Sequence, residues 1–125
     1  MSEVFLLLVM FQLKHFISDF PLQTQYMLGK MSRTNWILPL AAHAGVHSVG
    51  TFVIAFLFTS FSVAIGLSLA DFILHFIVDR IKASPNLGGR WKPDQSYFWW
   101  ALGADQMTHH LINYGFRYII LSSGN

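Results

Sequence analysis

The chain has 125 residues, of which 54% are hydrophobic and only 11% are charged, and its formal net charge is +2. Because an average soluble domain carries roughly 25% charged residues, this composition favours a small membrane protein over a soluble domain. The low net charge gives no reason to expect nucleic-acid binding, and the absence of cysteine excludes thiolate ligands and disulfides.

Four apolar stretches are long enough, or nearly so, to cross a hydrocarbon layer about 30 Å thick. They predict an all-α fold: a polytopic membrane protein with a bundle of four transmembrane helices in a single domain, residues 1–125. The predicted spans cover residues 4–20, 36–58, 61–81 and 97–121. No basic segment precedes the first stretch and no small-residue cleavage site follows it, so we expect a retained span and not a signal peptide.

The connections between the spans predict the orientation. Residues 21–35 could form an interfacial helix or a partly re-entrant loop; Thr59–Ser62 is a tight turn, and residues 83–96 are a loop rich in proline and glycine. The positive-inside rule places connections 1–2 and 3–4 in the cytoplasm and both termini outside. The basic residues behind this prediction are Lys30, Arg33, Arg80, Lys82, Arg90 and Lys92.

Aspartate and histidine residues recur inside the apolar stretches at a single spacing. Every step is i, i+4, which places both side chains on one face of an α-helix. A charged side chain within a membrane costs roughly 2.5–3.5 kcal/mol even on lenient insertion scales, so a shared cation would explain why several are present. The pairs are His15/Asp19, His43/His47 and Asp105/His109, and the triple is Asp71/His75/Asp79.

The predicted topology brings these motifs to one depth. With a rise of about 1.5 Å per residue, most of them lie roughly 5–18 Å below the cytoplasmic boundary. Nine candidate ligands are more than the four of a zinc site or the six of an octahedral site, so we expect two neighbouring ions. Some of the aspartates could instead orient histidine rings by hydrogen bonding to them. Nitrogen and oxygen ligands without sulfur favour zinc, with manganese or iron as alternatives.

Each motif also has a structural interpretation without a metal. A single buried histidine such as His43 is often a hydrogen-bonded packing residue, and the whole set could be charge-paired contacts between helices. Asp79 could pair with the basic residues that follow it, and Asp19 could cap the next segment. His110 lies about 100° around the helix from His109 and is the weaker ligand candidate.

The motifs resemble those of the domain-of-unknown-function 3307 family, small integral membrane proteins of bacteria and phages. The resemblance covers nearly the whole chain and implies a four-helix membrane protein, but little about activity. Asp71 has no clear place in the family pattern. A more distant similarity is to membrane-bound metal-dependent hydrolases. The segments that carry the family resemblance are His15-Phe-Ile-Ser-Asp19-Phe-Pro-Leu-Gln-Thr24, His43 with His47, His75-Phe-Ile-Val-Asp79-Arg-Ile-Lys82, and Asp105-Gln106-x-x-His109.

Three functions follow from the motifs. The leading hypothesis is a membrane-embedded hydrolase with one or two metal ions, acting on a lipid or headgroup ester or phosphate from the cytoplasmic leaflet, where Lys30, Arg33, Arg80 and Lys82 attract an anionic headgroup. The alternatives are a non-catalytic interaction protein with a structural metal, and a cation or proton carrier. We expect membrane lipids as partners, and a membrane protein or a second copy of the chain is an alternative partner. The motifs do not assign a catalytic role to any individual residue. The expected direct ligands are His43, His47, His75, Asp79 and His109, supported by His15, Asp19, Asp71 and Asp105.

Overall fold

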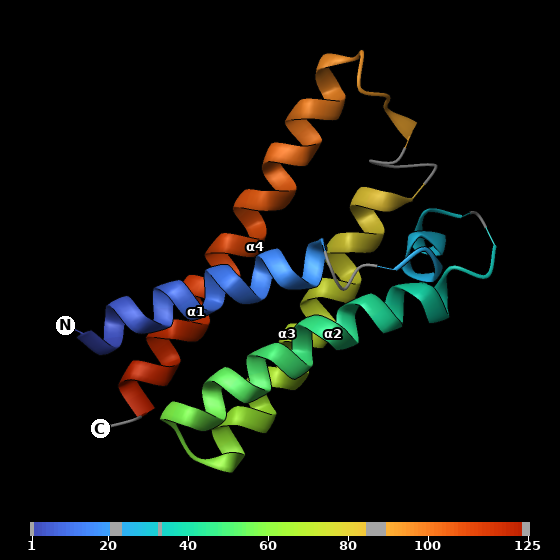
Figure 1. Cartoon of the computed structure of the whole chain (residues 1–125). Helices are drawn as coiled ribbons and strands as arrows, with labels where there is room; N and C mark the ends of the chain where they lie inside the picture. The colour runs from blue at the N-terminus through green and yellow to red at the C-terminus, as the bar shows by residue number, and fades with distance from the viewer. Residues whose placement is uncertain (1, 21–23, 33, 85–89, 124–125) are drawn as a thin grey trace.

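The computed structural model describes residues 2–20, 24–32, 34–84 and 90–123. Within these ranges all regular structure is helical, which confirms the all-α prediction (Figure 1). The elements are α1 (Ser2–Asp19), the short 3₁₀ helix η1 (Tyr26–Met31), α2 (Ile37–Phe58), α3 (Phe61–Ala83) and α4 (Ser96–Ser123). The connection whose form the sequence left open therefore contains a short helix. Arg33 and residues 85–89 of the predicted loop at 83–96 lie outside the described residues.

A two-residue turn joins α2 to α3, as the sequence predicts. The Thr59 backbone N–H donates to the Ala55 carbonyl at 2.8 Å and closes α2. Ser60 then caps α3, because its hydroxyl accepts from the backbone N–H of Val63 at 3.4 Å. With both helix ends satisfied inside two residues, α2 and α3 pack antiparallel along their length.

The remaining helices lie against this hairpin. In Figure 1, α1 crosses α4, while the α2–α3 turn, the start of α1 and the end of α4 share one end of the molecule. The opposite end holds η1 and the start of α4. This is the arrangement of ends that four consecutive passes would produce.

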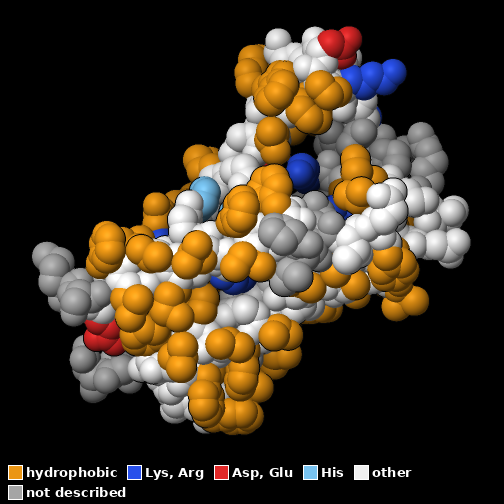
Figure 2. Space-filling model, in the orientation of Figure 1, with side chains coloured by type: hydrophobic (Ala, Val, Ile, Leu, Met, Phe, Trp, Pro, Cys, Tyr) orange, Lys and Arg blue, Asp and Glu red, His pale blue; other side chains and the backbone are white. Residues whose placement is uncertain are grey.

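The distribution of side chains is inverted relative to a soluble protein. Among the described residues, fifteen polar or charged side chains are buried against twelve hydrophobic ones, and large apolar side chains such as Phe5, Leu38, Leu69 and Tyr118 are well exposed. Figure 2 shows hydrophobic side chains over most of one face, with acidic ones only at its two ends. Of the described helices, α2 and α3 are apolar and long enough to cross a membrane.

The interior divides into two halves. The half near the α2–α3 turn is a hydrophobic core that joins all four long helices: Leu7, Phe11, Ile54, Ala55, Ala64, Leu67, Phe116 and Ile120. The half toward η1 contains the i, i+4 motifs, with few buried apolar side chains among the described residues. The hydrophobic half fixes the helices relative to one another, and this positions the polar half.

Candidate metal centre

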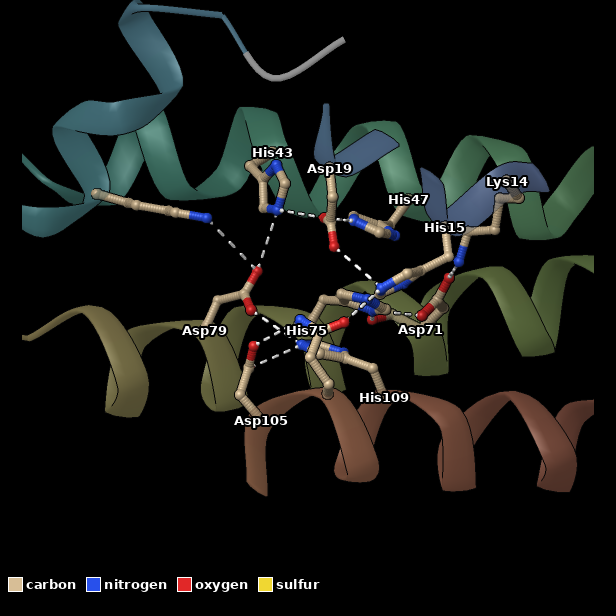
Figure 3. A network of polar contacts seen from close by, with 12 residues as sticks. Lys14, His15, Asp19, His43, His47, Asp71, His75, Asp79, Asp105 and His109 are labelled. Carbon is tan, nitrogen blue, oxygen red and sulfur yellow. Dashed lines mark hydrogen bonds and ion pairs between the residues drawn. The ribbon is translucent and has the colours of Figure 1, made fainter. Parts of the chain in front are cut away.

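All nine residues predicted from the motifs lie in the polar half and face the bundle interior (Figure 3). Eight are buried, and Asp19, at the last residue of α1, is partly buried. The i, i+4 spacing accounts for this, because each pair or triple follows one face of its helix. The four helices then direct these faces toward a common centre.

The first cluster of converging ligand atoms combines α1 and α2. Asp19 Oδ1 lies 2.8 Å from His47 Nε2 and 3.4 Å from His43 Nε2. The ligand atoms of these three residues lie within 4.8 Å of one another. We call them site A. Asp19 therefore contributes to the interior of the bundle.

The second cluster combines α3 and α4. His109 Nε2 lies 3.1 Å from Asp79 Oδ1 and 3.1 Å from Asp105 Oδ1. These three residues, which we call site B, also have ligand atoms within 4.8 Å of one another, and all three are buried. His43 links the two sites, since its Nε2 lies 3.3 Å from Asp79 Oδ2 as well as near Asp19.

The spacing of these atoms fits a bound divalent cation. Ligand atoms about 2.0–2.2 Å from a tetrahedral or octahedral metal lie roughly 3.0–3.6 Å from each other. The Asp–His separations within and between sites A and B run from 2.8 to 3.4 Å, which overlaps this range, and three of these contacts are themselves direct hydrogen bonds. In addition, the Nε2 atoms of His43 and His109 each face two carboxylates, although an imidazole nitrogen carries at most one hydrogen. A cation satisfies both carboxylates at once, whereas one N–H does not.

His75 and Asp71 form a separate unit beside the two sites. His75 Nδ1 lies 2.5 Å from Asp71 Oδ1, and Asp71 also accepts hydrogen bonds from Thr51 and, at 3.1 Å, from Lys14. The His75 ring lies against His47 at a centroid distance of 4.0 Å, and its Nε2 has no hydrogen-bond partner among the described residues. Asp71 thus holds the ring at Nδ1 and leaves Nε2 without a hydrogen-bond partner among the described residues, the usual carboxylate–histidine arrangement.

His15 occupies the space between α1 and α4. Its Nε2 lies 3.2 Å from Asp19 Oδ2 and donates to the Gln106 side-chain oxygen at 2.9 Å. Gln106 in turn donates to Asp105 at 3.1 Å, so it connects the two sites through α4. The His110 ring lies 5.3 Å from the His15 ring between centroids, tilted by 45°, and belongs to neither cluster.

Two lysines approach site B from the η1 side. Lys30 Nζ lies 4.0 Å from Asp79 Oδ2, and Lys82 Nζ lies 3.6 Å from Asp105 Oδ2. Burial lowers the pKa of Lys30, although the nearby Asp79 carboxylate opposes this change. Asp79 therefore pairs with a lysine of a different element and not with the basic residues that follow it in α3.

Sequence reasoning missed three partners of the site: Lys14, Thr51 and Gln106. Lys14 is buried and pairs with Asp71, which lies 57 positions away in the sequence. A lysine inside an apolar stretch is itself a signal, because such a charge requires a partner. Thr51 carries no comparable signal, since single hydroxyl groups are common in helices, whereas Gln106 lies within the Asp105-Gln106-x-x-His109 segment but was given no role.

These features define the class: an all-helical protein with an apolar exterior, whose interior holds a His/Asp cluster suited to divalent cations. The chain belongs to the family described as "Protein of unknown function (DUF3307)", whose sequence model matches residues 7–121 and therefore contains all nine candidate ligands. This confirms the resemblance seen in the motifs. No curated protein and no solved structure matches the chain.

Proposed function

We propose that this protein is an integral membrane hydrolase with two divalent metal ions, one in site A and one in site B. The observation that carries the proposal is that each site supplies three protein ligands. Structural zinc sites use four protein ligands, whereas catalytic sites use three and keep one position open. When bound, such an ion acts as a Lewis acid and brings the pKa of a coordinated water toward neutrality.

The inverted side-chain distribution supports a four-span membrane location. Beyond the two apolar helices α2 and α3, the helices α1 and α4 also expose large apolar side chains, including Phe5, Leu13, Leu111 and Tyr118. Burying their charged and polar side chains inside the bundle removes the cost of exposing them to lipid. The basic residues near η1 and the start of α4 support a cytoplasmic location of that end.

His75 is the residue suited to accept a proton from the attacking water. Asp71 fixes its Nδ1–H, so the unpartnered Nε2 is the basic nitrogen, and the ring stacks on His47 of site A and His109 of site B. In ester hydrolysis the water oxygen bonds to the acyl carbon or phosphorus and the ester bond breaks. Nε2 takes one proton of the water and delivers it to the departing alcohol oxygen. We therefore assign His75 to proton transfer and not to permanent ligation.

The test uses protein purified in detergent without chelator, with metal content measured by elemental mass spectrometry. We expect about two equivalents of zinc, manganese or iron. His75→Gln retains both ions and lowers turnover of phospholipid substrates by roughly 100-fold or more, while the control His110→Gln retains both ions and activity. Protein without stoichiometric metal would refute the proposal.

A second candidate is a purely structural metal site, and the divided interior favours it. Because the polar half has few buried apolar side chains among the described residues, an ion there would hold α1 and α4 against the hairpin. In that case chelation unfolds the protein and no lipid substrate turns over. The hydrolase proposal instead predicts that activity is lost with chelator at concentrations that leave the hydrophobic half folded.

A further inference from the structure

A small cavity lies beside site B, where η1, the end of α3 and the start of α4 meet. Its volume is about 80 Å³, and its walls include Lys30, Lys82, Trp91, Phe98 and Leu102. Figure 2 shows a basic side chain in the hollow between α4 and the end of α3. Water occupies roughly 30 Å³ per molecule in the liquid, so the cavity accommodates a few waters or one small tetrahedral group, but not a whole lipid.

The two lysines of this cavity neutralise the carboxylates of site B. Their Nζ atoms lie 4.0 Å from Asp79 and 3.6 Å from Asp105. A divalent ion in site B takes both carboxylates as ligands, and its charge repels the two ammonium groups. The divalent ion and the two carboxylates then cancel in charge, which leaves the two ammonium groups with a net charge of +2 that an anion in the cavity would offset.

The required anion has several oxygens that point in different directions. Lys30 and Lys82 come from different elements, η1 and α3, and their Nζ atoms reach two different carboxylates of site B. A tetrahedral phosphate group offers separate oxygens to each of these partners, and lysine is a common phosphate-binding residue. A planar carboxylate has only two oxygens.

From this geometry we infer that the cavity is a subsite for the phosphate group of the substrate. The inference rests on the proposed metal occupancy of site B, and it narrows the substrate class to phosphate esters. A phospholipid headgroup and free inorganic phosphate share this chemistry. The apolar wall formed by Trp91 and Phe98 then lies beside the remainder of a lipid headgroup.

If phosphate binds beside the ion in site B, phosphate raises the affinity for the metal, and the metal raises the affinity for phosphate by the same factor. The experiment measures Mn²⁺ affinity by electron paramagnetic resonance in three media: detergent with inorganic phosphate, nanodiscs containing phosphatidic acid, and nanodiscs of phosphatidylcholine alone. We expect roughly 10-fold tighter Mn²⁺ binding with the effective phosphate source. An effect of phosphatidic acid alone identifies the lipid headgroup as ligand, and an effect of inorganic phosphate shows that the free ion suffices.

Variants attribute the effect to the cavity. Lys82→Gln is the main variant, because its side chain is 40% exposed and its loss is compatible with folding. It should bind Mn²⁺ but lose the enhancement, as should Lys30→Gln; Lys92→Gln, an exposed lysine outside the cavity, should keep it. Mn²⁺ binding that no phosphate source changes, or an enhancement that survives in Lys82→Gln, would overturn this inference alone. Absence of Mn²⁺ binding would overturn the proposed function and this inference together.

Discussion

The substitution Gly50→Ala tests how closely α1 approaches α2 beside the polar half. A Cβ at position 50 would lie 2.7 Å from Cγ of Lys14 and 3.5 Å from its Cδ and Cε. Favourable carbon–carbon contacts begin at about 3.5 Å, so roughly 1 Å of movement is required. Because Cγ lies near the backbone, either α1 shifts or Lys14 leaves Asp71, with which its Nζ now pairs at 3.1 Å.

The expected cost follows from these two responses. Overpacking costs about 1–3 kcal/mol, and separating a buried ion pair costs about 3–5 kcal/mol. Thr51 and His75 still contact Asp71, so we expect Gly50→Ala to lower the free energy of unfolding by about 1–3 kcal/mol. The assay is an unfolding titration with sodium dodecyl sulfate in mixed micelles, followed by circular dichroism.

Gly45 on the same helix is the matched control. A Cβ there meets nothing within 4 Å, so Gly45→Ala should be neutral or stabilise by up to about 1 kcal/mol through helix propensity. If Gly50→Ala proves as stable as Gly45→Ala, the close packing of Lys14 on Gly50 is wrong.

Two further substitutions test contacts that hold the site. Lys14→Met leaves the Asp71 carboxylate buried without its cation and should lower the free energy of unfolding by about 3–5 kcal/mol. The double variant Lys14→Met/Asp71→Asn should recover most of this stability. An unfolding titration in which the double variant is no more stable than the single one would contradict the pairing. Arg80 donates to the Lys30 and Ser32 carbonyls at 2.9 and 3.2 Å and lies over the Trp36 ring at 3.9 Å. Arg80→Gln should therefore release η1 from α3 and speed proteolysis within residues 26–31 several-fold, whereas an unchanged cleavage rate would show that other contacts hold η1.

The sequence predicts the helices well, because the apolar runs and their boundaries are local. The predicted apolar stretches 36–58 and 61–81 correspond closely to α2 and α3, and the predicted turn at Thr59–Ser62 lies where the two helices meet. The form of η1 was not predictable. The position of η1 depends on Arg80, which donates to the Lys30 carbonyl and lies over the Trp36 ring. These contacts join residues far apart in the sequence and form only when the chain folds.

The sequence predicts, through the i, i+4 spacing, which polar side chains share a helix face, but not their partners on other helices. Asp71 and Asp79 share a face of α3, but eight residues separate them by about 12 Å. They therefore serve different groups: Asp79 belongs to site B, while Asp71 holds His75 and receives Lys14. The spacing of residues along the chain does not predict the ion pair between Lys14 and Asp71.

Metal stoichiometry in single-site variants tests the two-ion centre most directly. Wild-type protein, His47→Ala, His109→Ala and His43→Ala are purified without chelator and measured by elemental mass spectrometry beside the control His110→Ala. The account predicts about two ions in the wild type and the control, about one in His47→Ala and in His109→Ala, and weakened binding of both ions in His43→Ala. No bound metal in the wild type, or two ions in every variant, would contradict it.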